Sequence, residues 1–202
     1  MNKIFALLEK PAKLVFIIGG FVYALWFAIM QAMSIDGQFM NVLTNIIELF
    51  VGVCLICLPP VMLLLKKDEM AKLFFVFLLG YWVLTAPTEY FFLAETCADA
   101  REFYPVFVSI FLLAIGLALV GILVLIILEM LLGLKFLRPI VNLVALIFVA
   151  ACILTAILFM ILAGVMDAPW NFYVQYALMD MIVLPAIVGF GCLYFFGTGE
   201  KK

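Results

Sequence analysis

Residues 106–134 read VFVSIFLLAIGLALVGILVLIILEMLLGL, and Glu129 is the one charged side chain among them. A helix needs about 20 predominantly apolar residues to cross the hydrocarbon core of a bilayer. This stretch exceeds that length, so we expect it to form a membrane-spanning helix. Glu129 lies near its end, where it can reach Lys135 or extend towards the headgroups, and we expect a structural role for it.

Five further apolar segments accompany this one in a chain of 202 residues, 70% hydrophobic and 12% charged. They lie near residues 12–33, 42–65, 73–94, 140–166 and 176–196. The loops between them are too short for a separate domain. The sequence therefore predicts one all-α domain over residues 1–202, a compact bundle of six transmembrane helices. The third segment is the least regular, because Pro87, Thr88 and Glu89 interrupt it.

The basic residues predict how this bundle is oriented. With six spans, they fall on one side of the membrane: Lys3, Lys10, Lys13, Lys66, Lys67, Lys72, Lys135, Arg138, Lys201 and Lys202. The other side carries several acids, and Arg101 is its only base. Cytoplasmic loops of membrane proteins carry an excess of Lys and Arg. We therefore expect both termini to be cytoplasmic, and the chain to lie in the plasma (inner) membrane.

Three carboxylates lie inside the apolar segments: Glu48, Glu89 and Asp180. Counted from the outer ends of their spans, all three are roughly 6–10 Å deep. An acid retained in hydrocarbon is costly and is a candidate functional residue. It must be neutralised by a proton, a partner or a bound cation. The alternative is that these acids are hydrated near the headgroups, or that Arg101 pairs with one of them.

Polar and aromatic residues accompany the three acids. The expected site residues are Glu48, Glu89, Asp180, Tyr81, Thr85, Asn45, Trp170 and Tyr176, with Trp82 and Gln31 at the rim. Asn45, Thr85 and Tyr176 stand three or four residues before an acid, on the same helix face. Aromatic faces attract organic cations. We therefore expect an outward-opening polar cup for a small cationic or amine-bearing solute or a proton, in a small transporter or its membrane subunit.

The first apolar segment carries a stripe of small residues at four-residue spacing, namely Gly20, Ala24, Ala28 and Ala32. Such a stripe allows another helix backbone to approach closely. That helix can belong to the same chain or to a separate membrane protein. A partner docked there would favour a different function, that of a non-transporting accessory, assembly or immunity subunit acting through helix contacts.

The architecture resembles that of the substrate-binding S components of energy-coupling-factor vitamin transporters. The chain length, the six predicted spans, the cytoplasmic termini and the residues Ala24, Ala28 and Ala32 carry this resemblance. In that family, an alanine-spaced face of the first helix docks the transmembrane coupling subunit. The resemblance implies the same role for the alanine face of this chain.

Other chemistries find little support in the sequence. The chain has no histidine, no serine nucleophile with a base, and no basic patch for nucleic acid, so we expect no enzyme activity, metal or cofactor. Cys54 and Cys57 have redox spacing but fall in mid-span, where buried small hydrophobes are the simpler interpretation. Pro59 and Pro60 should kink or break the second span, either as a bent helix end or as a moving gate.

Overall fold

The computed structural model describes residues 2–33, 39–100, 103–165 and 173–197, with side chains described over shorter stretches of these ranges. Its elements are α1 (Asn2–Met33), α2 (Phe39–Leu64), α3 (Asp68–Ala100), α4 (Phe103–Leu132), the 3-10 turn η1 (Lys135–Leu137), α5 (Arg138–Val165), the π-helix η2 (Tyr173–Val183) and α7 (Leu184–Phe195). No strand occurs within the described ranges. The expected all-helical fold is confirmed.

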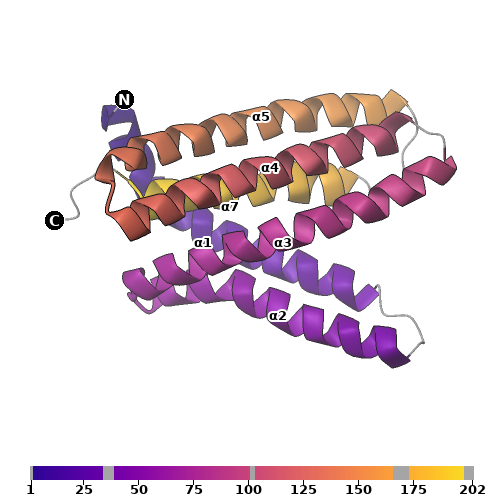
Figure 1. Cartoon of the computed structure of the whole chain (residues 1–202), viewed down its shortest axis with the longest axis horizontal. Coiled ribbons are helices and arrows are strands. Elements are labelled where there is room, and N and C mark those ends of the chain that lie inside the picture. The colour runs from indigo at the N-terminus through magenta and orange to yellow at the C-terminus, as the bar shows by residue number, and fades with distance from the viewer. Residues whose placement is uncertain (1, 34–38, 101–102, 166–172, 198–202) are drawn as a thin grey trace.

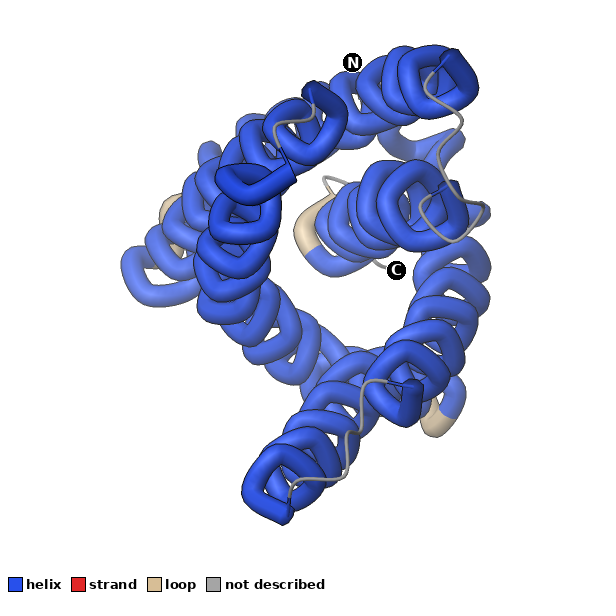
Figure 2. Tube along the Cα trace, turned by 90° about the vertical axis from the view of Figure 1, so that its right-hand side faces the viewer, coloured by secondary structure: helices blue, strands red, loops and turns tan. Residues whose placement is uncertain are grey.

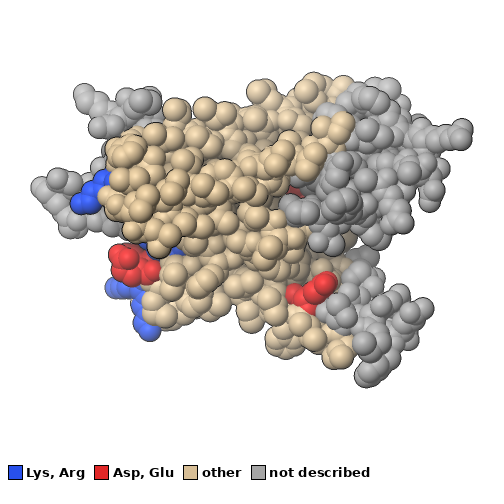
Figure 3. All heavy atoms as spheres, in the orientation of Figure 1, with Lys and Arg blue, Asp and Glu red and all other residues tan. Residues whose placement is uncertain are grey.

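Successive helices run in opposite directions along the bundle (Figure 1). Both termini lie at the end that also carries the α2–α3 and α4–α5 connections. We call this end of the bundle the basic end, because the Lys and Arg side chains visible in Figure 3 gather there. Its basic residues include Lys66, Lys67, Lys135 and Arg138.

Five stretches of the described chain are long and apolar enough to cross a membrane. They are Pro11–Ala32, Ile46–Leu64, Leu113–Leu132, Lys135–Ile161 and Leu178–Phe195. They correspond to five of the six segments expected from the sequence. The remaining segment, residues 73–94, lies within α3, which is not among the five.

The outer face of the bundle is apolar, as the membrane interpretation requires. Phe50, Leu117 and Leu131 are 68%, 66% and 77% exposed. Exposed apolar surface this extensive would make a soluble monomer aggregate, whereas lipid tails solvate it well. The chain therefore has the composition and surface of a membrane protein.

The prolines inside α2 and α3 do not end these helices. α2 continues through Pro59 and Pro60 and ends at Leu64. α3 continues through Pro87 to Ala100. A proline removes one backbone donor, and neighbouring helices in a bundle can compensate for that loss. Of the expected kink or break at Pro59 and Pro60, the break is therefore wrong, and the kink stays a prediction.

The C-terminal helix, formed by η2 and α7, lies inside a ring made by the other helices (Figure 2). In its span, 61% of residues are buried, against 22–28% in the other four spans. It packs mainly against α1 and α5. The C-terminal helix is therefore the central helix of the bundle. Its side chains pack against protein around most of its circumference, whereas the other helices also face lipid.

Close packing around α7 depends on aromatic rings and a glycine. Phe16 of α1, Phe75 of α3 and Phe195 of α7 meet with ring centroids 5.3–5.5 Å apart. A Cβ on Gly191 would lie 2.6 Å from the Phe75 ring and 3.0 Å from that of Phe16. The missing side chain of Gly191 thus allows both rings to reach the α7 backbone.

Candidate ligand-binding site

A cavity of about 270 Å³ lies between α1, α2 and α3. We call it the aromatic cavity; it is lined by Tyr23, Phe27, Gln31, Glu48, Tyr81, Trp82 and Thr85. Ligand pockets in proteins commonly measure about 300–1,000 Å³. This cavity lies just below that range and suits a small solute.

Helical spacing explains why these residues share one cavity. Tyr23, Phe27 and Gln31 follow one another at four-residue intervals on α1, and Tyr81 and Thr85 do so on α3. Residues four apart lie one above the other on the same helix face. One turn after Glu48 on α2 comes Gly52, which is buried. α1 and α3 therefore each present a helix face to the cavity, and α2 contributes Glu48.

Gly52 sets how closely the aromatic rings approach α2. A Cβ at this position would lie 2.3 Å from Cε1 and 2.5 Å from Cζ of Phe27, and 3.1 Å from the Tyr81 hydroxyl oxygen. Any side chain here would therefore push the Phe27 ring away. At Gly52, one ring from α1 and one hydroxyl from α3, both belonging to residues that line the aromatic cavity, therefore lie against the α2 backbone.

The other two aromatic side chains are held in a fixed arrangement. Tyr23 and Trp82 pack edge to face, with centroids 5.7 Å apart and ring planes at 86°. Both are buried, at 8% and 5% exposure. The Thr85 hydroxyl donates a hydrogen bond to the Trp82 backbone carbonyl at 3.3 Å, one turn back on α3. Two of the four aromatic rings that line the cavity thus pack against each other.

The charge of the aromatic cavity is negative. Glu48 is the only ionisable acid among its described lining residues, and no Lys or Arg belongs to that lining. Glu48 is exposed, which places its carboxylate at the mouth. Aromatic faces also carry negative electrostatic potential. The arrangement favours a cation that has an apolar body and a positive head.

The structure brings together Glu48, Tyr81 and Thr85 of the expected site, with the rim residues Trp82 and Gln31. Asp180, half-buried on the π-helix η2, makes contacts of its own and does not line the aromatic cavity. The side chains of Asn45, Glu89 and Tyr176, and the whole of Trp170, lie outside the described residues. The cavity is thus built around one acid in the described part of the chain.

Sequence reasoning missed Tyr23 and Phe27. The signal was nevertheless present, because Tyr23, Phe27 and Gln31 repeat at the same four-residue interval as the small-residue stripe. Each stands one position before a member of that stripe. The small-residue stripe allows one side of α1 to pack closely against another helix. The row of larger residues beside it then lines the cavity.

The small-residue stripe itself is partly occupied within the chain. A Cβ on Gly20 would lie 2.6 Å from Cγ of Pro60, so α1 and α2 meet closely there. Ala24 is 4% exposed, Ala28 is half-buried and Ala32 is exposed. At Gly20 and Ala24, the stripe serves packing inside the bundle, and only its far end faces outward.

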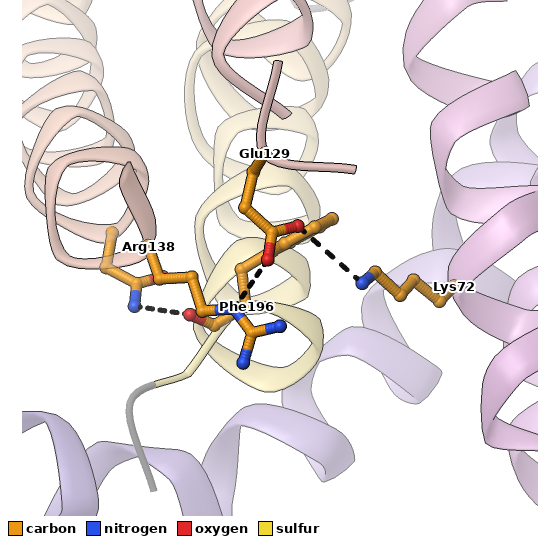
Figure 4. Close-up of polar contacts among 5 residues, drawn as sticks. Lys72, Glu129, Arg138 and Phe196 are labelled. Carbon is orange, nitrogen blue, oxygen red and sulfur yellow. Dashed lines mark hydrogen bonds and ion pairs between the residues drawn. The ribbon is translucent and has the colours of Figure 1, made fainter. Parts of the chain in front are cut away.

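A second polar cluster lies at the basic end (Figure 4). Glu129 of α4 is 4% exposed and accepts a hydrogen bond from Arg138 Nε at 2.6 Å. Lys72 Nζ of α3 lies 3.9 Å from its other oxygen. The partners of Glu129 are therefore Arg138 and Lys72 rather than Lys135, because the turn after α4 brings the start of α5 back beside it.

The same cluster holds the end of α7. Asn142 Nδ2 donates to the Phe196 backbone carbonyl at 3.0 Å, and Lys72 Nζ lies 4.5 Å from the Phe196 ring centroid. The last carbonyls of a helix lack intrahelical donors, so the Asn142 bond satisfies one of them. Nearby, the Tyr194 hydroxyl donates to Asp68 at 3.2 Å. Four helices are joined here by polar contacts.

The cysteines form no disulfide among the described residues. Cys54 is exposed, Cys57 half-buried, and Cys152 and Cys192 buried, all as free thiols.

Comparison of the chain with protein-family models, curated proteins and solved structures finds no match.

Proposed function

We propose that this chain is a small membrane transporter, or the membrane subunit of one, that binds a small organic cation in the aromatic cavity. One observation carries the proposal. Glu48 and four aromatic side chains surround a single cavity whose described lining contains no Lys or Arg. An anionic solute would be repelled by the Glu48 carboxylate, and a neutral solute would gain no electrostatic attraction from it.

The chemistry of such a site is that of an aromatic cage with a counter-ion. A cation over an aromatic face gains about 0.5–1 kcal/mol at an exposed site and about 2 when desolvated. The carboxylate of Glu48 at the mouth adds electrostatic attraction for a cation. A primary amine or a quaternary ammonium of a few carbon atoms matches both the cavity volume and this charge.

The proposed topology has six spans, with α3 as the sixth, and both termini in the cytoplasm of a bacterial-type inner membrane. Its support is the gathering of Lys and Arg at the end that carries both termini (Figure 3). Basic loops remain on the cytoplasmic side. In that orientation, the aromatic cavity lies in the outer half of the bundle and opens away from the cytoplasm.

The rival proposal, an accessory subunit that docks through α1, has less surface available. Gly20 and Ala24 are already covered by the chain itself. A partner would have to dock on Ala28 and Ala32 alone, about one turn of helix. This favours solute binding over helix docking as the function.

Ligand binding is tested with purified protein and isothermal titration calorimetry. The probes are choline, tetramethylammonium and 3,3-dimethylbutanol, the last being the neutral isostere of choline. We expect the two cations to bind and the neutral alcohol to bind at least tenfold more weakly. Glu48→Gln should weaken cation binding about tenfold, which corresponds to one charge-assisted contact.

Glu69→Gln is the matched control, because Glu69 is an exposed acid at the basic end, away from the cavity. Its cation affinity should equal that of the wild type. Equal binding of choline and its neutral isostere, or equal effects of the two substitutions, would contradict the proposal. Uptake of radiolabelled choline into proteoliposomes then separates a complete transporter, which accumulates it, from a binding subunit that requires a partner.

A further inference from the structure

A second cavity, of about 260 Å³, lies at the basic end beside the α4–α5 turn. Its lining consists of Lys72, Glu129, Met130, Gly133, Lys135 and Arg138. Three positive side chains and one negative side chain leave two positive charges in excess. Lys135 is exposed and forms no ion pair with any residue in the described ranges. We call this cavity the cationic pocket.

The backbone around the cationic pocket also favours an anion. α4 ends at Leu132, and Gly133 adopts φ +63°, a conformation that turns the chain sharply without steric cost. α5, 28 residues long, begins at Arg138. The N-terminus of a helix carries partial positive charge. The start of α5 therefore adds to the field of Lys72, Lys135 and Arg138.

Apolar side chains border the cationic pocket. Met130 lines it and is 41% exposed, while Leu131, Leu132 and Phe136 nearby are 77%, 61% and 63% exposed. A pocket for a free, fully hydrated anion has no need of such a border. The combination of positive charge and exposed apolar surface matches a molecule that carries both a phosphate and hydrocarbon.

An apolar groove of about 320 Å³ lies between the same two helices, further from the basic end. Its lining includes Ala118 of α4 and Val144, Phe148 and Ala151 of α5. At about 1.5 Å per residue, its near edge lies roughly 9 Å along α5 from Arg138 and roughly 18 Å along α4 from Met130. One leaflet of a bilayer is about 15 Å deep, so an acyl chain would reach the near edge of this groove on α5, whereas the near edge on α4 lies about 3 Å deeper than one leaflet.

We propose that the α4–α5 face binds an anionic phospholipid, with its phosphate in the cationic pocket and an acyl chain along the apolar groove. Basic pockets between transmembrane helices on the cytoplasmic side commonly hold acidic head groups. Glu129 keeps Arg138 and Lys72 in place, and Lys135 supplies the unpaired positive charge. This site is separate from the aromatic cavity, and its test does not depend on the proposed transport function.

The test is lipid titration by native mass spectrometry of the detergent-solubilised protein. Phosphatidylglycerol is compared with phosphatidylcholine, and inorganic phosphate is added in excess as a competitor. We expect phosphatidylglycerol to bind more tightly and phosphate to compete poorly. Lys135→Gln should weaken phosphatidylglycerol binding about fivefold, the contribution of one basic residue near an anionic head group. Ala151→Phe, which fills the groove, should also weaken it several-fold.

Two matched controls separate the site from general surface properties. Lys67→Gln removes an exposed lysine at the same end outside the pocket, and Ala150→Phe adds the same ring at an exposed α5 position outside the groove. Neither should change the affinity. The proposal is overturned if both lipids bind equally, if Lys67→Gln matches Lys135→Gln, or if phosphate displaces the lipid while Ala151→Phe has no effect. Lys135 and Ala151 are exposed, so unchanged melting temperatures verify that the variants fold.

Discussion

Glu48 and Glu129 are the same residue type in two different environments of one bundle. Glu129 is 4% exposed and has two basic partners from other helices. Glu48 is exposed at the mouth of the aromatic cavity, whose described lining contains no base. A carboxylate paired within the protein stabilises the fold, whereas one that faces an open aromatic cavity is available to a ligand.

The aromatic residues differ between the two ends in the same way. At the basic end, the Phe196 ring is met by the ammonium of Lys72, 4.5 Å from its centroid. In the aromatic cavity, four rings surround space that no protein cation of the described lining enters. The protein thus completes its own cation–π contact at one end. At the other end, the corresponding aromatic surface lines the aromatic cavity.

The largest expected effect comes from Glu129→Gln. Removing one partner of a buried ion pair costs about 3–5 kcal/mol, and the partial exposure of Arg138 places this case near 3 kcal/mol. Thermal unfolding of the purified protein in detergent measures the loss. Glu69→Gln, an exposed acid at the same end, should change the free energy of unfolding by less than about 0.5 kcal/mol. Equal shifts for both variants would remove the distinction between paired and unpaired acids.

A smaller effect is expected from Gly52→Ala. The added methyl group would collide with the Phe27 ring, and overpacking typically costs about 1–3 kcal/mol. Displacement of the ring should also weaken choline binding in the calorimetric assay. Gly80→Ala is the matched control, because a Cβ there meets nothing within 4 Å. That variant should gain about 0.5–1 kcal/mol from better helix propensity. If Gly52→Ala is also stabilising, the close contact with Phe27 does not exist.

The smallest expected effect is that of Trp82→Phe on ligand affinity. Trp is the strongest cation–π partner, and its replacement by Phe should weaken tetramethylammonium binding about threefold to fivefold. Trp26→Phe is the control, since Trp26 is half-buried on α1 outside the cavity lining. Titration calorimetry of both variants distinguishes them. An affinity loss shared by Trp26→Phe would mean that Trp82 acts through the fold and not through the ligand.

The helical fold was predictable because the length of each apolar run can be counted in the sequence. Each residue of a 20-residue apolar run contributes to that signal, and the runs around residues 106–134 and 140–166 carry almost no charge. Helix ends were harder to predict. Of the kink or break expected at Pro59 and Pro60, the break does not occur, and neighbouring helices in a bundle can compensate for the missing donors.

The site was predictable only in part. The depth of an acid follows from counting residues along its helix, and this singled out Glu48 together with Tyr81 and Thr85 on α3. Counting does not tell which way a side chain points around the helix axis, however, so it could not exclude Asp180 from the same cavity. Counting depth also passed over Phe27, because the signal for that residue is its four-residue spacing from Tyr23 and Gln31 rather than its depth.

By itself, the sequence determined an all-helical chain with apolar segments of membrane length and with basic residues at alternate connections between them. Both properties can be read from neighbouring residues along the chain, without knowing how the helices pack. Only the tertiary structure decided that α7 is the central helix, that Gly52 admits the Phe27 ring, and that Glu129 pairs with Arg138 and Lys72. These features depend on the rotation of each helix about its axis and on its neighbours. In a chain that is apolar on nearly every face, hydrophobic periodicity carries little information about either.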